Sequence, residues 1–277
     1  MYFQFNFRLF INAMALIFIF STTLFAQETC NCPTQNKTGR GSIYVAWGYH
    51  RDWYTNSTIH FTNHENANYD FEIQNAKAID SPDYDDLFNR PISVPQYVFN
   101  LGYMFNKKGD WGVEFSWDHI KYILPDNQTL HVKGTIDNVR YDLDTVVGID
   151  FVRFEHTNGG NYCMINGVKR WNLLHSKNGL HWLSVFAKAG AGVPIPKTDS
   201  RLFGRRNDGP FHISGYVVGA SASLRYNFFK YLFIEGSLKG AFANYNNTYV
   251  DLDHKGRAKH HFFSAQLIWS GGFNVPF

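Results

Sequence analysis

The sequence predicts an all-β fold: a closed, antiparallel, up-and-down barrel that crosses a membrane with eight strands and carries long extracellular loops. Three observations predict it. Apolar residues recur at every second position in segment after segment, which is the period of a strand with one apolar face. The positions between them are polar or charged, as on the lumen side of a membrane barrel. Short turns and long loops alternate along the chain, as they do when the long loops lie outside.

The first 26 residues predict export. Arg8 precedes an apolar stretch over residues 9–25, which is short for a spanning helix of ~20 apolar residues, and Ala26 offers a small residue for cleavage. We therefore expect a signal peptide over 1–26, a polar periplasmic leader over 27–40 and a barrel domain over 41–277. The alternative is an uncleaved helical anchor.

Composition limits the protein class. Of 277 residues, 18% are aromatic and only 9 are proline. The mean hydropathy of −0.30 argues against a helical membrane protein but not against a barrel, in which half of each strand is polar. The net charge of +3 and the absence of a basic run exclude an obvious nucleic-acid partner.

The three cysteines suggest no metal site. Cys30 and Cys32 are too close in sequence for an unstrained disulfide, and no partner stands near them at zinc spacing. Cys163 lies alone in a strand. We expect neither a metal nor a cofactor.

The first four strands are expected at 43–53, 94–105, 111–122 and 162–174. The first carries Ile43, Val45 and Trp47 on its apolar face. The second and third are joined by a turn of Asn, Lys, Gly and Asp over 106–110. The fourth alternates less regularly.

The last four strands are expected at 183–193, 214–228, 232–243 and 263–277. A link over 229–231 makes the middle two a tight hairpin. The last strand is apolar or glycine at every odd position and includes Trp269, Phe273 and Phe277.

The long connections contain further strand-like pieces, at 58–62, 69–73, 130–136 and 148–156. Either they extend the barrel beyond the membrane, or they raise the strand count to ten.

A soluble β-sandwich is the competing fold. Clustering of aromatic residues near strand ends, as in the interfacial girdles of barrels, favours the membrane protein; Trp111, Trp182 and Tyr122 belong to this set.

The aromatic C-terminal strand resembles the end of bacterial outer-membrane barrels, and the chain resembles the outer membrane protein A and W types over its whole mature length. The resemblance implies that Phe273 and Phe277 form the signal for the barrel-assembly machinery. It also implies residence in the outer membrane, with membrane lipids and lipopolysaccharide as partners. Such families include adhesins, membrane-anchoring scaffolds and conduits for small hydrophobic ligands.

Charged residues fall on the faces opposite the apolar ones. An eight-stranded lumen is only wide enough to be filled by side chains, so charges there must pair or cost several kcal/mol each. We expect an interior ion-pair network that plugs the lumen. Its members are Glu114, Asp118, Lys188, Arg225, Glu235 and Lys239.

A catalytic hypothesis rests on His156. Some outer-membrane barrels that resemble this one remove acyl chains from lipid A with a His, a Ser two positions later and a distant acid. That resemblance implies His156 as base, Thr157 or a Ser as nucleophile and Asp118 as acid. The chain lacks Ser at the expected position, and a polar turn over 158–160 is the simpler interpretation.

Two loop features have plain interpretations. His254, His260 and His261 are expected in a solvated loop, and the acidic residues of the first long loop are expected to keep it soluble or to attract divalent cations. Three functions therefore stay open: a structural or interaction protein with ligand-capable loops, an outer-leaflet lipid A or phospholipid hydrolase, and a narrow channel for small hydrophobic solutes.

Overall fold

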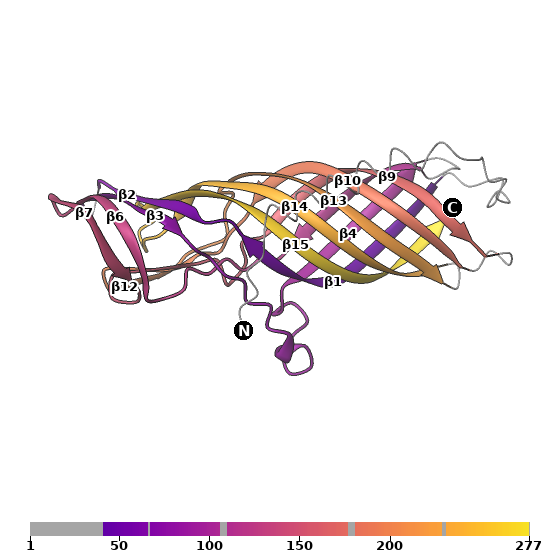
Figure 1. Ribbon diagram of the computed structural model, residues 1–277, viewed down its shortest axis with the longest axis horizontal. Coiled ribbons are helices and arrows are strands. Elements are labelled where there is room, and N and C mark those ends of the chain that lie inside the picture. Colours follow the sequence, from indigo (N-terminus) through magenta and orange to yellow (C-terminus); the bar gives the residue numbers. More distant parts are fainter. Residues whose placement is uncertain (1–40, 66, 106–109, 177–180, 229–230, 277) are drawn as a thin grey trace.

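The computed structural model describes residues 41–65, 67–105, 110–176, 181–228 and 231–276. The expected signal peptide and leader, with Cys30, Cys32 and Phe277, lie outside the described residues. The molecule is elongated, with a barrel at one end and a smaller β-structure, which we call the head, at the other (Figure 1).

Within the described residues, eight strands form a closed antiparallel ring, and each pairs with the next ring strand along the chain. The ring closes between its first and last members, in register from Ser42 opposite Pro276 to Tyr54 opposite Ser264. The predicted eight-stranded, up-and-down barrel is confirmed, and the alternative of ten is wrong. The ring strands are β1 (Gly41–Tyr54), β4 (Tyr97–Phe105), β5 (Trp111–Asp118), β9 (Tyr162–His175), β10 (Trp182–Pro194), β13 (Gly215–Phe228), β14 (Leu232–Tyr249) and β15 (Arg257–Pro276).

Alternation of side chains gives the ring two unlike faces. In β1, Ile43 and Val45 are each 39% exposed on the outside, whereas Tyr44 and Ala46 are buried inside. The same period-two pattern holds around the ring, since successive residues of a strand point to opposite faces. Exposed outer residues of other strands include Leu101, Val113, Ile165, Leu224, Ile234 and Leu267.

The head continues the barrel sheet and adds a second one. Residues 257–259 of β15 pair with β2 (Ser57–Asn63), which is followed in the sheet by β3 (Tyr69–Ala76), β6 (Gln128–Ile136) and β7 (Val139–Val147). The expected strand-like pieces at 58–62, 69–73 and 130–136 therefore extend the barrel sheet, whereas the piece at 148–156 contributes to a different sheet. The second sheet contains β8 (Val152–Glu155), β11 (Asp199–Leu202) and β12 (Arg205–Asp208). A short 3-10 helix, η2 (Tyr84–Asp86), lies in the loop before β4.

The head has an apolar core of its own between the two sheets. Phe61 of β2 stacks on Phe71 of β3 with ring centroids 5.2 Å apart, and packs edge-on against Phe154 of β8 at 5.6 Å. All three rings are at most 1% exposed. The cluster continues into the barrel mouth through Tyr162 and Phe262, so the head covers that end of the lumen.

Several strand boundaries differ from those expected, including the start of β15, which lies at Arg257 and not at 263. β5 ends at Asp118, because residues 119–122 are all buried and a segment buried at every position cannot alternate between lumen and outer face. Tyr122 is therefore a core residue and not part of an aromatic girdle. Trp182, also expected in the girdle, is 5% exposed. β14 continues to Tyr249, past a bulge between Tyr245 and Thr248, where a long loop was expected.

Phe71→Ala is expected to unfold the head while the barrel remains closed. Removal of a buried aromatic ring costs about 3–5 kcal/mol, and Phe71 contacts only head residues among its ring partners. Limited proteolysis will cut residues 55–96 and 123–161 faster, while the heat-dependent gel migration of the barrel stays the same. Val146→Ala, at a site 55% exposed, is the control. Equal protease resistance of the two variants would contradict an independent head core.

Candidate functional site

The middle of the lumen is occupied by an ion-pair network centred on Lys188. Its Nζ donates to Glu114 Oε2 at 2.7 Å and to Glu235 Oε1 at 3.0 Å. The second oxygen of Glu235 accepts from Arg225 Nε at 2.5 Å, and Tyr44 OH donates to Glu114 at 2.8 Å. The five residues come from β1, β5, β10, β13 and β14, so one network connects five strands.

Three aromatic rings surround the Arg225 guanidinium. Its Cζ lies 4.3 Å from the ring centroid of Tyr44, 4.2 Å from that of Phe186 and 3.9 Å from that of Phe233. A cation is stabilised over an aromatic face, and more so where water is excluded. These rings therefore fill the lumen beside the charges. They also offset the cost of burying the Arg225 charge.

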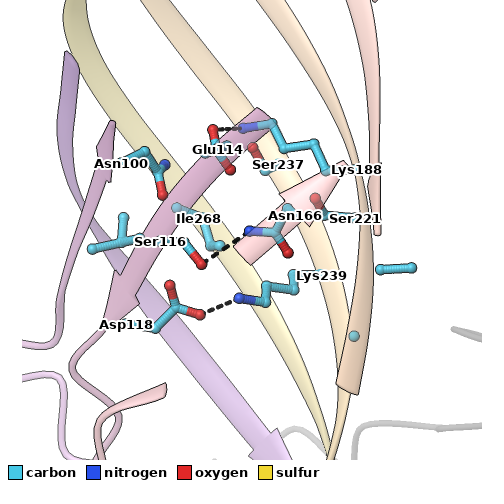
Figure 2. A pocket seen from close by; sticks show the side chains of 13 residues that line it. Asn100, Glu114, Ser116, Asp118, Asn166, Lys188, Ser221, Ser237, Lys239 and Ile268 are labelled. Atoms are coloured by element: carbon cyan, nitrogen blue, oxygen red, sulfur yellow. Dashed lines mark hydrogen bonds and ion pairs between the residues drawn. The ribbon is translucent and has the colours of Figure 1, made fainter. Parts of the chain in front are cut away.

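A second ion pair lies closer to the head. Lys239 Nζ bonds to Asp118, and between this pair and Lys188 the side chain of Asn166 donates to Ser116 Oγ at 3.2 Å (Figure 2). The cavity that these groups line has a volume of about 20 Å³. That is room for about one water molecule.

The six interior charges expected from the sequence thus lie in two groups. Glu114, Lys188, Arg225 and Glu235 form one, and Asp118 with Lys239 forms the other; each of the six is at most 6% exposed. Sequence analysis missed the rings of Tyr44, Phe186 and Phe233. The signal was available, because all three occupy the inward parity of ring strands, and Phe186 and Phe233 share β10 and β14 with three of these charges.

The catalytic candidates do not form a triad. His156 Nδ1 lies 3.0 Å from Thr198 Oγ1, and its Nε2 lies 3.3 Å from Nε2 of His260. Asp118 is bonded to Lys239 in the lumen, and Thr157 is the partly exposed neighbour of His156 in sequence. Within the described residues, the hydrogen bonds of the His156 ring go to Thr198 and His260 and not to a carboxylate.

His156 lies in an aromatic cluster at the junction of barrel and head. The ring is fully buried and stacks on Tyr245 at 4.9 Å. Burial lowers the pKa of His156 to about 3, because the charged imidazolium would lose its hydration. Burial likewise lowers the pKa of His119, which bonds to Asn161, to about 4. Both rings are therefore neutral at pH 7.

His260 is the clearest departure from the expected solvated loop. It is 3% exposed in β15 and faces His156, whereas His254 and His261 are exposed. For His261 the difference follows from strand parity, since β15 begins at Arg257 and places even-numbered residues inward, whereas His254 lies in the loop before that strand.

Other expected features are distributed as follows. Phe273 is 61% exposed on the outer face of β15, and Cys163 is an unpaired, half-buried thiol. In the acidic first loop, Asp80 pairs with Arg51 at 2.8 Å and Asp83 pairs with Lys121.

Within the described part of the chain, no three His, Cys, Asp or Glu side chains gather as metal ligands. No helix in that part is long and apolar enough to cross a membrane.

No protein-family model matches the chain, and no curated protein matches it. Solved structures with a similar fold are small bacterial outer-membrane barrels. The attachment invasion locus protein Ail of Yersinia pestis is 14% identical over 85% of this chain and 99% of its own, with a TM-score of 0.32. Neisserial surface protein A is 11% identical over 86% and 99%, with a TM-score of 0.35. OprG of Pseudomonas aeruginosa is 9% identical over 86% and 97%, with a TM-score of 0.38.

Glu235→Leu is expected to destabilise the folded barrel by about 3–5 kcal/mol, because it leaves Arg225 buried without its carboxylate. Urea titration in detergent or lipid measures the loss. Glu65→Gln, which breaks an exposed pair with Lys255, is the control and should leave the midpoint unchanged. A midpoint for Glu235→Leu that equals the wild-type value would contradict a structural role for the network.

Acid is expected to destabilise the junction between barrel and head. An unfolded histidine titrates near pH 6.5, whereas folded His156 and His119 stay neutral down to about 3 and 4. The unfolding free energy is therefore highest above pH 6.5. Below it, each buried histidine lowers that free energy by up to about 1.4 kcal/mol per pH unit.

Thermal unfolding between pH 7.5 and 4.5 measures this slope. His156→Phe keeps an aromatic ring but removes the titration, so its slope should be smaller, whereas the exposed His261→Phe should match wild type. An unchanged slope in His156→Phe would show that other groups cause the acid sensitivity.

Proposed function

We propose that this chain is an integral protein of a bacterial outer membrane, which crosses it as a sealed barrel and holds the head outside as an interaction surface. The proposal includes export by residues 1–26, a periplasmic leader over 27–40, and contact with outer-membrane lipids and lipopolysaccharide. Its role is structural or adhesive rather than catalytic.

One observation carries the membrane assignment: polarity is inverted relative to a water-soluble protein. Ile165 is 61% exposed and Ile234 is 55% exposed on the outside of the ring, whereas Arg225 is 3% exposed within it. A belt of exposed apolar side chains around a whole barrel is stable in contact with acyl chains and prone to aggregation in water. Ring closure leaves no strand edge to face the hydrocarbon.

A sealed lumen fits the interior better than a channel does. The cavity between the two ion-pair groups holds about one water molecule, and the ion pairs connect opposite walls. Beyond them, the aromatic core of the head covers the barrel mouth. A solute would have to break both layers to pass.

The head supplies the surface through which such a protein would act. Its loops expose large apolar side chains that the core does not use, among them Leu252 at 75% and Ile213 at 60%. In the proposed role, these side chains are contacts for a partner. Phe273 on the outer face of β15, together with Phe277, is the proposed signal for the barrel-assembly machinery.

The geometry does not favour a hydrolase. A general base for lipid deacylation must be reached by the lipid, and His156 is fully buried with Thr198 and His260 as its partners. Lipid A from cells with and without the gene is accordingly expected to have the same acylation pattern by mass spectrometry.

The purified chain is expected to insert into planar bilayers and to pass little or no current. The Lys188→Gly/Glu235→Gly variant removes the centre of the ion-pair network and should conduct more, provided that its heat-dependent gel migration shows a folded barrel. Large, steady current steps from the wild type would contradict the sealed lumen. Recovery of the unmodified chain in the soluble fraction would contradict the membrane assignment itself.

A further inference from the structure

Among the residues that the structure describes, strand β7 pairs on one side only and is a free edge of the sheet. The order of the twelve-stranded sheet begins at β1, which pairs with β15, and ends at β7, whose pairing partner in that sheet is β6. Figure 1 shows β7 at the tip of the head, at the end of the molecule farthest from the barrel. It lacks proline and lysine, the residues that commonly blunt an edge strand against pairing.

The hairpin geometry identifies the backbone groups that face outward. Asp137 and Asn138 have φ of 49° and 64° and form a two-residue turn, with Ile136 opposite Val139. The residues that flank such a turn bond to each other, so odd-numbered residues of β7 direct their backbone groups to β6. The N–H and C=O groups of Arg140, Asp142 and Asp144 therefore point away from the sheet.

We propose that a second copy of this chain docks on this edge, with β7 antiparallel to β7 and Tyr141 opposite Tyr141 across a twofold axis. In this register Arg140 of each copy faces Asp142 of the other. Val139 of each copy also faces Leu143 of the other. The segment 139–143, with the sequence Val-Arg-Tyr-Asp-Leu, is thus complementary to itself when reversed.

Charge selects this register from its neighbours. A shift that moves the axis to residue 140 places Arg140 opposite Arg140, and a shift to 142 places Asp142 opposite Asp142. Like charges directly opposite each other destabilise a strand pair, whereas opposite charges stabilise it. With the axis at Tyr141, two pairs of unlike charges lie opposite each other and no like charges of the two strands do. The other positions of the axis in β7 do not meet both conditions.

The side chains involved are accessible. Val139 is 56% exposed and Leu143 is 46% exposed. Asp142 bonds to His131 through one oxygen at 3.0 Å, and its side chain is 49% exposed. Among the described residues Arg140 makes no ion pair, and its side chain is exposed.

A five-residue strand pair is a small interface. Dense reconstitution in lipid vesicles raises the effective concentration of copies in the same bilayer and in facing bilayers. The test therefore uses the whole chain in lipid vesicles rather than dilute detergent, with its three native cysteines replaced by serine.

Tyr141→Cys is expected to form a disulfide-linked dimer on mild oxidation, because residues at the axis form a non-hydrogen-bonded pair with Cα atoms about 4.5 Å apart. Val139→Cys alone should not, since its copies would lie four residues apart along the strand, about 13 Å. A mixture of Val139→Cys and Leu143→Cys should link as a heterodimer. Heat-dependent gel migration verifies that each barrel is folded.

Charge variants test the register independently. Arg140→Asp in the Tyr141→Cys background should reduce dimer formation by about fivefold or more, because two attractive pairs become repulsive. Arg140→Asp/Asp142→Arg should restore it. Equal dimer yield from Tyr141→Cys and Val139→Cys, or no recovery in the double exchange, would overturn the proposed pairing.

Discussion

Closure of the ring is the constraint on which the rest of the structure depends. The pairing of β1 with β15 satisfies the last backbone groups of the ring, and the proposed membrane setting offers no water to satisfy them otherwise. With eight strands, closure leaves a lumen that only side chains can fill. Charges on the inner face are then forced together, and Lys188 between Glu114 and Glu235 is the result.

The same constraint explains what the sequence could predict. Ring strands face the outside of the barrel on one side and the lumen on the other, so their residues alternate, and period two identified all eight. The alternation also predicted which charged residues face the lumen, but it did not predict which of them pair. Pairing depends on the stagger between neighbouring strands and on the length of a lysine side chain, and the sequence of a single strand contains neither. The inward rings of Tyr44, Phe186 and Phe233 carry the same parity and were overlooked because aromatic residues were assigned to the outer face.

Prediction was poorest at the junction of barrel and head. There the chain is buried on every side, and alternation disappears. Residues 119–122 are buried in succession, and His156 and His260 lie together although 104 positions separate them. A polar turn and a solvated loop were the natural interpretations of those segments. These segments are buried because the sheet that contains β8 packs onto the barrel mouth, and that packing involves residues far apart in the sequence.

Closure also determines where the molecule can meet another protein strand to strand. Within the described residues every edge of the ring is paired, and the twelve-stranded sheet keeps one free edge, at β7. In the proposed membrane setting an unpaired edge in hydrocarbon would be costly, and the free edge lies in the head instead. The lumen is filled and the barrel mouth is covered, and neither offers a surface to a partner. The exposed apolar side chains and open backbone groups of the head lie outside the barrel, which is why the proposed interaction surface is assigned to the head.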